Sequence, residues 1–353
     1  MSETKIAILG SGLMGRLIAM RLHQEGFTDL SLIEKDGAQI SSSPAMIAAG
    51  MLAKFSESVM GGELIYQLGK ASISLWRNYL LKLKAQHLLN DSGTLLVAQA
   101  KFFSETAHYI SKISFNTALD NYYQLLAKPQ LSQLEPDLNF NQAYFLPSEG
   151  ALDAPKVMDS LHDYLVDKVN WRTNSAVSSV DSAGVVIING NTENFAMILD
   201  CRGLGAKSIY PQLRGVRGEI IRVCAPDVRL SRPVRLFHPR HNIYIVPCSD
   251  NHYVIGATEL ETLDYSPVTV RSTMDLLNCA YHIHPGFAEA RITSLASSCR
   301  PALDNNLPQI KKQNHLIAIN GLYRHGFLVA PTLTEEIINY LKNGTQQFIQ
   351  VWS

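Results

Sequence analysis

The chain has 353 residues, of which 46% are hydrophobic and 18% are charged, and its formal net charge is zero. This composition is ordinary for a globular protein with a sizeable core, and the length predicts two domains. The balanced charge argues against sequence-independent binding to nucleic acid or to an anionic membrane, because such binding needs clustered Lys and Arg. Five cysteines without a CxxC pair are typical of reduced thiols. We find no cleavable signal and no run long enough for a membrane span, so we expect a cytoplasmic protein.

Residues 5–34 have the pattern of a strand, a helix and a second strand. The apolar run Ile6–Leu9 leads into the turn Gly10-Ser11-Gly12-Leu13-Met14-Gly15, after which apolar residues recur at helical spacing. The second strand, 30–34, ends in Glu34, nineteen residues after Gly15. This is the arrangement of a dinucleotide-binding βαβ unit.

Each residue of this motif meets a physical requirement of a bound dinucleotide. Gly10 permits the tight turn, Gly12 lets the backbone approach a pyrophosphate, and Gly15 lets the helix pack closely on the strand. The helix N-terminus presents free N–H groups to the phosphates, and Glu34 can accept hydrogen bonds from ribose hydroxyls. The motif alone leaves open whether the dinucleotide is FAD or NAD, and a glycine-rich turn that binds nothing is the structural alternative.

The segment that follows does not continue into a third regular βα unit. Residues 41–52 are mostly small and contain Pro44 and Gly50, which predicts a loop with a short helix. Further along the chain the pattern predicts helices at 63–86, 131–136 and 155–166 and strands at 94–98, 143–146, 150–153, 176–180, 185–188 and 195–200.

The strand at 195–200 runs into a second glycine turn, Cys201-Arg202-Gly203-Leu204-Gly205-Ala206, which we expect beside the first turn in a doubly wound sheet. Strands at 219–224, 234–237, 242–246 and 253–257 then predict a second, largely antiparallel sheet, with a helix at 268–282 crossing back. A strand at 317–320 and a closing helix over 335–341 end the pattern. The fold class is therefore α/β, with a Rossmann-like nucleotide domain and an interleaved α+β domain.

Several later segments, in order and spacing, carry a resemblance to a known family. They are Ala48–Leu52, Cys201–Gly203, Val216–Glu219, Tyr244–Pro247, Ile255–Thr258, Arg300-Pro301 and Tyr323–Gly326. Together with Gly10–Gly15 and Glu34, they resemble the glycine oxidase branch of the FAD-dependent D-amino-acid oxidase family. The similarity is strongest to the glycine oxidases of thiamine biosynthesis, which make the imine used for the thiazole ring.

The resemblance implies FAD as cofactor and two interleaved domains. Residues 1–85, 150–213 and 295–353 would form the FAD-binding domain, and 86–149 and 214–294 the substrate-binding domain. The residues implied to contact FAD are Gly10, Gly12, Leu13, Met14, Gly15, Glu34, Lys35, Ala48, Ala49, Gly50, Met51, Val177, Cys201, Gly203, Arg300 and Gly326. No metal site is implied.

The resemblance also implies an activity, the oxidative deamination of glycine or another small amino acid. Arg300 matches the arginine that clamps the substrate carboxylate, Tyr244 the tyrosine that bonds the same group, and Arg324 a residue beside the flavin and the substrate amine. Hydride would pass from Cα to flavin N5, and dioxygen would reoxidise the flavin to give peroxide. Relatives also imply a homo-oligomer.

Other interpretations remain open at this point. They are a dehydrogenase of D-amino acids or secondary amines with another acceptor, an NAD-dependent hydroxyacid dehydrogenase, and a flavoprotein that acts on a partner protein. Asn242, Glu259 and the loop 301–304 depart from the family pattern near the substrate pocket, so they leave the substrate open. The locally basic series is read as a solvated or subunit-facing surface; it comprises Arg214, Arg217, Arg222, Arg229, Arg232, Arg235 and Arg240.

Overall fold

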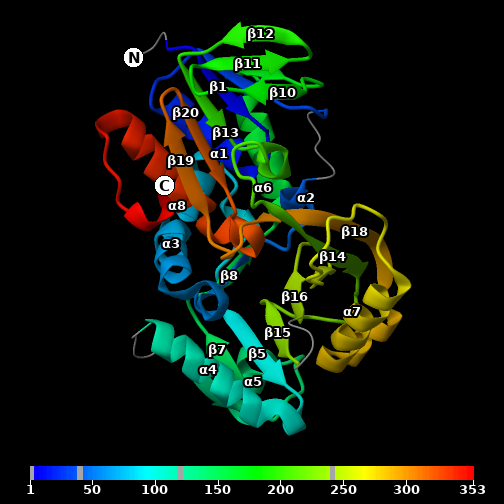
Figure 1. The fold of residues 1–353 in the computed structure, drawn as a ribbon. Helices are drawn as coiled ribbons and strands as arrows, with labels where there is room; N and C mark the ends of the chain where they lie inside the picture. The colour runs from blue at the N-terminus through cyan, green and yellow to red at the C-terminus, as the bar shows by residue number, and fades with distance from the viewer. Residues whose placement is uncertain (1–3, 38–42, 118–121, 239–242) are drawn as a thin grey trace.

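The protein is described here by a computed structural model that covers residues 4–37, 43–117, 122–238 and 243–353. It begins with the predicted βαβ unit, in which β1 (Ile6–Leu9) leads through the glycine turn into α1 (Leu13–Gln24) and then β2 (Leu30–Ile33). β1 and β2 pair in parallel, with Ile6 opposite Leu30 and Leu9 opposite Ile33 (Figure 1). The predicted unit is therefore confirmed.

This unit lies at the centre of a six-stranded sheet with the order β19-β20-β13-β1-β2-β9. The remaining strands are β9 (Asn170–Arg172), β13 (Met197–Asp200), β19 (Gln309–Gln313) and β20 (Leu316–Asn320). β13 pairs in parallel with β1, so the second glycine turn lies beside the first, as expected. Only the edge strand β19 is antiparallel to its neighbour. The carboxyl ends of the parallel strands thus meet at one edge of the sheet.

The two faces of this sheet have different covers, because successive side chains of a strand point to opposite faces. Ile6 and Ile8 pack into a core with the helices α1, α3 (Lys54–Lys82), α6 (Ala154–Leu165) and α8 (Gly326–Asn343). Ala7 and Leu9 pack against a small antiparallel sheet, which is visible in green at the top of Figure 1. Its strands are β10 (Val177–Val180), β11 (Val185–Ile188) and β12 (Asn191–Asn194).

A second large sheet has eight strands in the order β18-β14-β17-β16-β15-β5-β7-β6. The strands are β5 (Thr94–Ala98), β6 (Gln124–Ala127), β7 (Gln142–Leu146), β14 (Arg214–Cys224), β15 (Val234–Phe237), β16 (Ile243–Pro247), β17 (His252–Gly256) and β18 (Arg291–Ala302). All pairs except β5 with β15 are antiparallel, which confirms the predicted largely antiparallel sheet.

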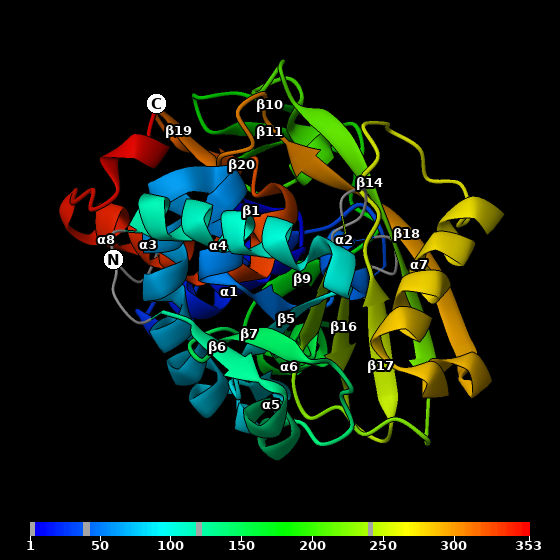
Figure 2. The same ribbon diagram turned by 90° about the horizontal axis from the view of Figure 1, so that it is seen from below.

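The helix predicted at 268–282 is α7 (Val270–Ile283), and it covers one face of the second sheet (Figure 2). Leu276 and Ile283 of this helix share a buried cluster with Ile221, Val223 and Ile255 of the sheet. At about 25 cal/mol for each Å² of apolar surface removed from water, such a cluster stabilises the sheet by several kcal/mol.

The remaining elements connect the two large sheets. They are α2 (Pro44–Ile47), α4 (Phe103–Thr117), α5 (Lys128–Leu134), a small sheet of β3 (Met51–Leu52), β8 (Gly150–Leu152) and β4 (Leu89–Asn90), and 3₁₀ turns at Gln86–Leu88, Ala100–Phe102, Gly203–Ala206, Pro285–Glu289, Tyr323–His325 and Ile349–Val351. α3 begins at Lys54 instead of the predicted Glu63, because Gly62, at φ +64° and ψ −162°, joins two helical segments across a kink.

Each large sheet takes strands from segments that are far apart in the sequence, since the chain crosses between the sheets several times. The division into domains at the residues given above stays a prediction. Among the helices formed by the described residues, none combines the length and the hydropathy of a bilayer span.

Candidate active site

A cavity of about 700 Å³ is lined by residues from both large sheets. All the residues predicted to contact cofactor or substrate lie on its wall, except Gly15. They are Gly10, Gly12, Leu13, Met14, Glu34, Lys35, Ala48, Ala49, Gly50, Met51, Val177, Cys201, Gly203, Tyr244, Arg300, Arg324 and Gly326. The chain thus brings the predicted nucleotide and substrate residues to one place, and their chemical roles stay predictions.

The glycine turn after β1 leaves its backbone open toward the cavity. Gly10 has a left-handed φ of +88°, and a Cβ on Gly15 would lie only 1.9 Å from the carbonyl oxygen of Gly10. A Cβ on Gly12, by contrast, would meet nothing closer than Ser43 Oγ at 3.8 Å. Gly12 is the N-cap of α1, and none of the described side chains caps this helix. The first N–H groups of α1 are therefore available to an anion.

Glu34 lies at the end of β2, where the sequence predicts a ribose contact. Its Oε2 accepts hydrogen bonds from Ser11 N at 2.8 Å and from Ser11 Oγ at 3.1 Å, so the carboxylate is fixed beside the glycine turn. Its Oε1 accepts from Asp36 N at 3.2 Å. Lys35 is exposed at the same edge of the cavity.

The cavity is also lined by residues 48–51 and by the second glycine turn. Position 50 requires a glycine, because φ is +68° and a Cβ would lie 2.2 Å from the carbonyl oxygen of Leu152. In the second glycine turn, Arg202 forms an ion pair with buried Asp200 at 2.7 Å and donates to the carbonyl of Val177 at 3.3 Å. Burial raises the pKa of the Cys201 thiol, and the Asp200 carboxylate raises it further. This thiol therefore stays protonated at neutral pH.

Tyr244 and Arg300 project from one face of the eight-stranded sheet. Tyr244 pairs with Gly256, Gly256 with Ile220 and Ile220 with Ala296, and alternate residues of β18 bring Arg300 to the same face. The Tyr244 side chain leans over Gly256, where a Cβ would come within 3.0 Å of its hydroxyl. Burial raises the pKa of Tyr244, although Arg300 and Arg324 lower it in part. The hydroxyl is therefore neutral and able to donate.

Arg300 packs over Gly218 of β14, because a Cβ there would lie 2.2 Å from Arg300 Nη2. Its Nη1 donates to the carbonyl oxygen of Thr258 at 3.2 Å. Among the described residues, no carboxylate forms an ion pair with Arg300. It is therefore a positioned guanidinium on the cavity wall whose charge is open to an anionic ligand.

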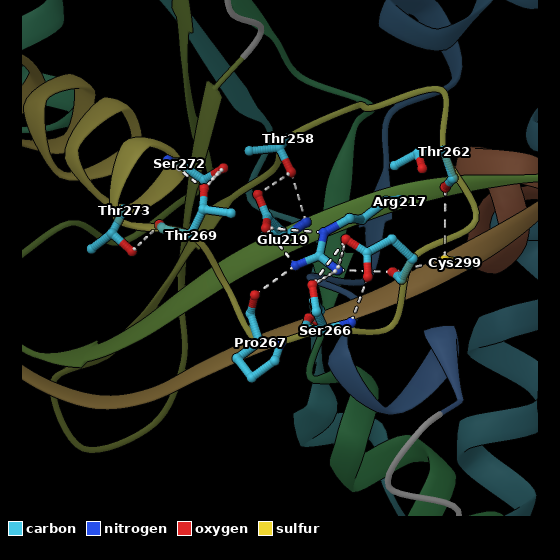
Figure 3. A network of polar contacts seen from close by, with 12 residues as sticks. Arg217, Glu219, Thr258, Thr262, Ser266, Pro267, Thr269, Ser272, Thr273 and Cys299 are labelled. Atoms are coloured by element: carbon cyan, nitrogen blue, oxygen red, sulfur yellow. Dashed lines mark hydrogen bonds and ion pairs between the residues drawn. The ribbon is translucent and has the colours of Figure 1, made fainter.

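A buried ion pair behind the sheet fixes the segment that supports Arg300 (Figure 3). Arg217 Nη2 contacts Glu219 Oε1 at 2.7 Å, and Arg217 Nη1 donates to the carbonyl of Asp264 at 2.8 Å. Glu219 Oε2 accepts from Thr258 Oγ1 at 3.1 Å, and Glu219 N donates to the same hydroxyl at 2.9 Å. Thr258 therefore holds its carbonyl toward Arg300 from a fixed position.

Arg324 lies between two carboxylates. Its Nε is 2.9 Å from Glu57 Oε2, and its Nη1 is 2.7 Å from Glu259 Oε2. His325 Nδ1 lies 2.9 Å from the same oxygen of Glu57. Burial alone would raise the pKa of Glu57, but the charges of Arg324, His325 and Arg235 outweigh it and hold the pKa well below its usual range. Glu57 is thus a buried anion that holds Arg324 against the cavity.

Replacing Glu57 with glutamine is expected to lower the free energy of unfolding at neutral pH by about 1.5 to 3 kcal/mol, because Arg324 and His325 lose their charged partner. The depressed pKa means that the Glu57 charge stabilises the fold above the ordinary pKa near 4.5, and that this contribution is lost as the pH falls below it. The variant should therefore show a flatter loss of thermal stability between about pH 5 and pH 3.

Glu63→Gln is the matched control, since Glu63 is exposed on the same helix and the change in net charge is identical. If the thermal stability of the Glu57 and Glu63 variants fell equally steeply between about pH 5 and pH 3, the Glu57 carboxylate would not be the stabilising anion.

Sequence reasoning missed Glu57, Arg235 and Tyr323 on the wall of this cavity. It was also wrong about part of the basic series, because Arg217 is only 1% exposed and Arg235 only 6% exposed. Arg235 stands in an apolar strand pattern, Val234–Phe237, and a charge at such a position was the signal that could have revealed it. Asn242 and Arg240 lie outside the described residues.

Comparisons with known proteins show the family and the fold to which the chain belongs. The family described as FAD dependent oxidoreductase matches residues 5–339. A protein of Rhizobium etli, whose provisional name is thiamine biosynthesis oxidoreductase ThiO, is 35% identical over 339 residues, which cover 96% of each chain. The glycine oxidase of Geobacillus kaustophilus is 26% identical over 92% of this chain and 89% of its own length. The crystal structure of that enzyme superposes with a TM-score of 0.86 at 23% identity over 98% of this chain and 96% of the other.

The match to the family covers nearly the whole chain, and the similarity in fold extends over both large sheets. The predicted fold class and the predicted cofactor are thereby confirmed, and the chain belongs to the family of FAD dependent oxidoreductases.

Proposed function

We propose that the protein oxidises glycine or another small amino acid at its α-carbon. The observation that carries the proposal is Arg300, a guanidinium that no described carboxylate neutralises and that faces the same cavity as the nucleotide turn. The names of two relatives, a glycine oxidase and an oxidoreductase of thiamine biosynthesis, support the same activity.

FAD fits the residues that line the cavity. We infer that the pyrophosphate lies against the backbone of Gly10 and Gly12, where the open space at Gly12 and the uncapped start of α1 suit an anion. Glu34 would accept hydrogen bonds from the adenosine ribose, and the residues from Ala48 to Met51 would line the flavin. The cavity runs from these residues to Arg300, so one bound molecule can reach both ends.

The substrate is held by its carboxylate. The planar guanidinium of Arg300 can offer two parallel charge-assisted hydrogen bonds, and the neutral hydroxyl of Tyr244 can offer a third. Three contacts fix the orientation of Cα, and such positioning supplies much of the rate enhancement. When bound, the flavin supplies the two-electron acceptor that takes the hydride from Cα, and we propose dioxygen as the final acceptor, with peroxide as its product.

The product of this oxidation is an imine, which water hydrolyses if it is released. The name of the Rhizobium relative supports a place in thiamine biosynthesis, and we propose that the imine serves there in building the thiazole ring.

An anaerobic titration of the purified flavoprotein tests this proposal. We expect glycine, sarcosine or D-alanine to bleach the flavin absorbance and readmitted air to restore it. Bleaching without recovery in air would favour a dehydrogenase with another electron acceptor. A bound flavin that none of the three amino acids reduces would contradict the proposed activity.

A further inference from the structure

Glu259 lies on the cavity wall in a segment whose backbone is attached to β14 on both sides of it. On one side, Thr258 N donates to the carbonyl of Glu219 at 3.2 Å. On the other, Leu260 N donates to the carbonyl of Arg217 at 3.0 Å, and Arg217 N donates back to Leu260 O at 2.8 Å. The backbone at Glu259 is therefore held in place, and its side chain is bonded to residues outside β14.

The strand that holds this segment is itself rigid. Arg217 and Glu219 are both fully buried and paired with each other, and Arg217 Nη2 also donates to the carbonyl of Pro267 at 2.9 Å (Figure 3). Breaking a buried ion pair of this kind is strongly unfavourable, so the position of Glu259 is built into the fold.

The Glu259 carboxylate meets two residues of the turn that precedes α8. It accepts hydrogen bonds from the Tyr323 hydroxyl and from Arg324 Nη1. Tyr323 is buried and takes a left-handed φ of +51°, which is uncommon for a tyrosine and costs about 1 kcal/mol or more. The turn is thus held in the conformation that presents both partners to Glu259.

Neutralising Arg324 does not require Glu259, because the buried carboxylate of Glu57 already lies 2.9 Å from Arg324 Nε. Glu259 adds a second negative charge and is 37% exposed. It also directly follows Thr258, whose carbonyl accepts from the free cation Arg300. One wall of the cavity therefore carries the open positive charge of Arg300 and, close to it, the fixed negative charge of Glu259.

We infer that Glu259 restricts the site to substrates with a single anionic group, that is, amino acids whose side chain or N-substituent carries no second carboxylate. This inference rests on the proposed function, in which Arg300 binds the substrate carboxylate. A second carboxylate on the same small molecule would face Glu259. Of the other two arginines on this wall, Arg324 is already paired twice, and Arg235 is only 6% exposed and lies 4.0 Å from Glu57 Oε1. Like charges that face each other in a partly desolvated site repel more strongly than they do in bulk water.

The test compares two ligands that lack the amine and have nearly the same shape. Diglycolate has two carboxylates, and its monoamide has one. Isothermal titration calorimetry of the FAD-loaded protein measures both dissociation constants without any turnover. We expect diglycolate to bind more weakly than the monoamide by about 10-fold or more, and Glu259→Gln to reduce this ratio by roughly 10-fold. Glutamine keeps the size of the side chain and an acceptor oxygen for Tyr323.

Glu261→Gln is the matched control, because Glu261 stands two residues away, is exposed and pairs with Arg214 at 3.0 Å outside the cavity. Its ratio of dissociation constants should equal that of the unchanged protein. An unchanged ratio in the Glu259 variant, or equal binding of the two ligands by the unchanged protein, overturns the inference.

A second measurement separates failure of this inference from failure of the proposed function. The rate of flavin reduction is compared for iminodiacetate and its monoamide. In the Glu259 variant, the rate with iminodiacetate should rise relative to the rate with the monoamide. If the monoamide of diglycolate binds but no amine reduces the flavin, the proposed oxidation fails while the charge selection stands. If glycine reduces the flavin but the Glu259 variant discriminates between the two ligands as the unchanged protein does, the proposed oxidation stands and only the inference about charge selection fails.

Discussion

Replacing Arg300 with alanine is expected to weaken the binding of the amino acid substrate by about 2 to 5 kcal/mol while FAD stays bound. This corresponds to roughly 30- to 4,000-fold in the dissociation constant. The reason is that Arg300 is the one cation at this end of the described cavity that no described carboxylate pairs with, so nothing else on the wall can replace its charge. Binding is measured by the change in the flavin spectrum under anaerobic titration.

Two further variants sharpen this expectation. Arg300→Lys keeps the charge but loses the planar fork, so its affinity should fall between those of the alanine variant and the unchanged protein. Arg291→Ala removes an exposed arginine from the start of the same strand and should leave substrate binding unchanged. If the Arg300→Ala variant turned over substrate with an ordinary KM, the carboxylate would have to bind elsewhere.

The nucleotide half of the site could be predicted because its requirements are local. Gly10, Gly12 and Gly15 lie within six residues, and the helical spacing that follows makes the strand-to-helix turn recognisable. The parallel pairing of β1 with β2 then brings Glu34 to the turn without any long-range information. The second glycine turn, at 201–206, was placed beside the first by the same logic of parallel strands.

The substrate half depends on pairings between distant segments. Tyr244 and Arg300 reach the same cavity only because four strands of the second sheet, β16, β17, β14 and β18, align in register. The strand that carries Arg300, β18, was not predicted as a strand. Its first five residues are exposed at the sheet edge and its next residues are small and polar, so no clear alternation marks it. The family resemblance, and not the pattern of residues, pointed to Arg300.

The charged residues around Arg324 illustrate a second limit. Glu57 sits in a helical segment where a charge usually faces solvent, and its burial becomes evident only when Arg324 and His325 arrive from the other end of the chain. Glu259 was noticed as a departure from the family pattern, but its two partners could not be inferred from spacing. Arg217 and Arg235 were misread as surface for the same reason, since burial of a charge depends on partners that are distant in sequence.

Alanine substitutions at Gly12 and Gly15 are expected to fail in different ways, although both glycines belong to the same motif. At Gly15 the new Cβ would lie 1.9 Å from the Gly10 carbonyl oxygen, so helix and strand must separate. We expect a loss of about 3 kcal/mol or more in the stability of the protein even without FAD. At Gly12 the φ of −67° suits alanine and the nearest atom is 3.8 Å away, so the FAD-free protein should keep its stability.

The methyl group at residue 12 instead occupies the space that we assign to the pyrophosphate, and we expect FAD affinity to fall on the order of 100-fold. Thermal unfolding with and without added FAD separates the two cases, because a ligand stabilises only the folded state that binds it. Gly15→Ala should lower the midpoint of the FAD-free protein, whereas Gly12→Ala should lower only the increase that FAD produces. If Gly12→Ala kept the full increase, the pyrophosphate would not lie against this turn, and the free N–H groups at the start of α1 would need another ligand.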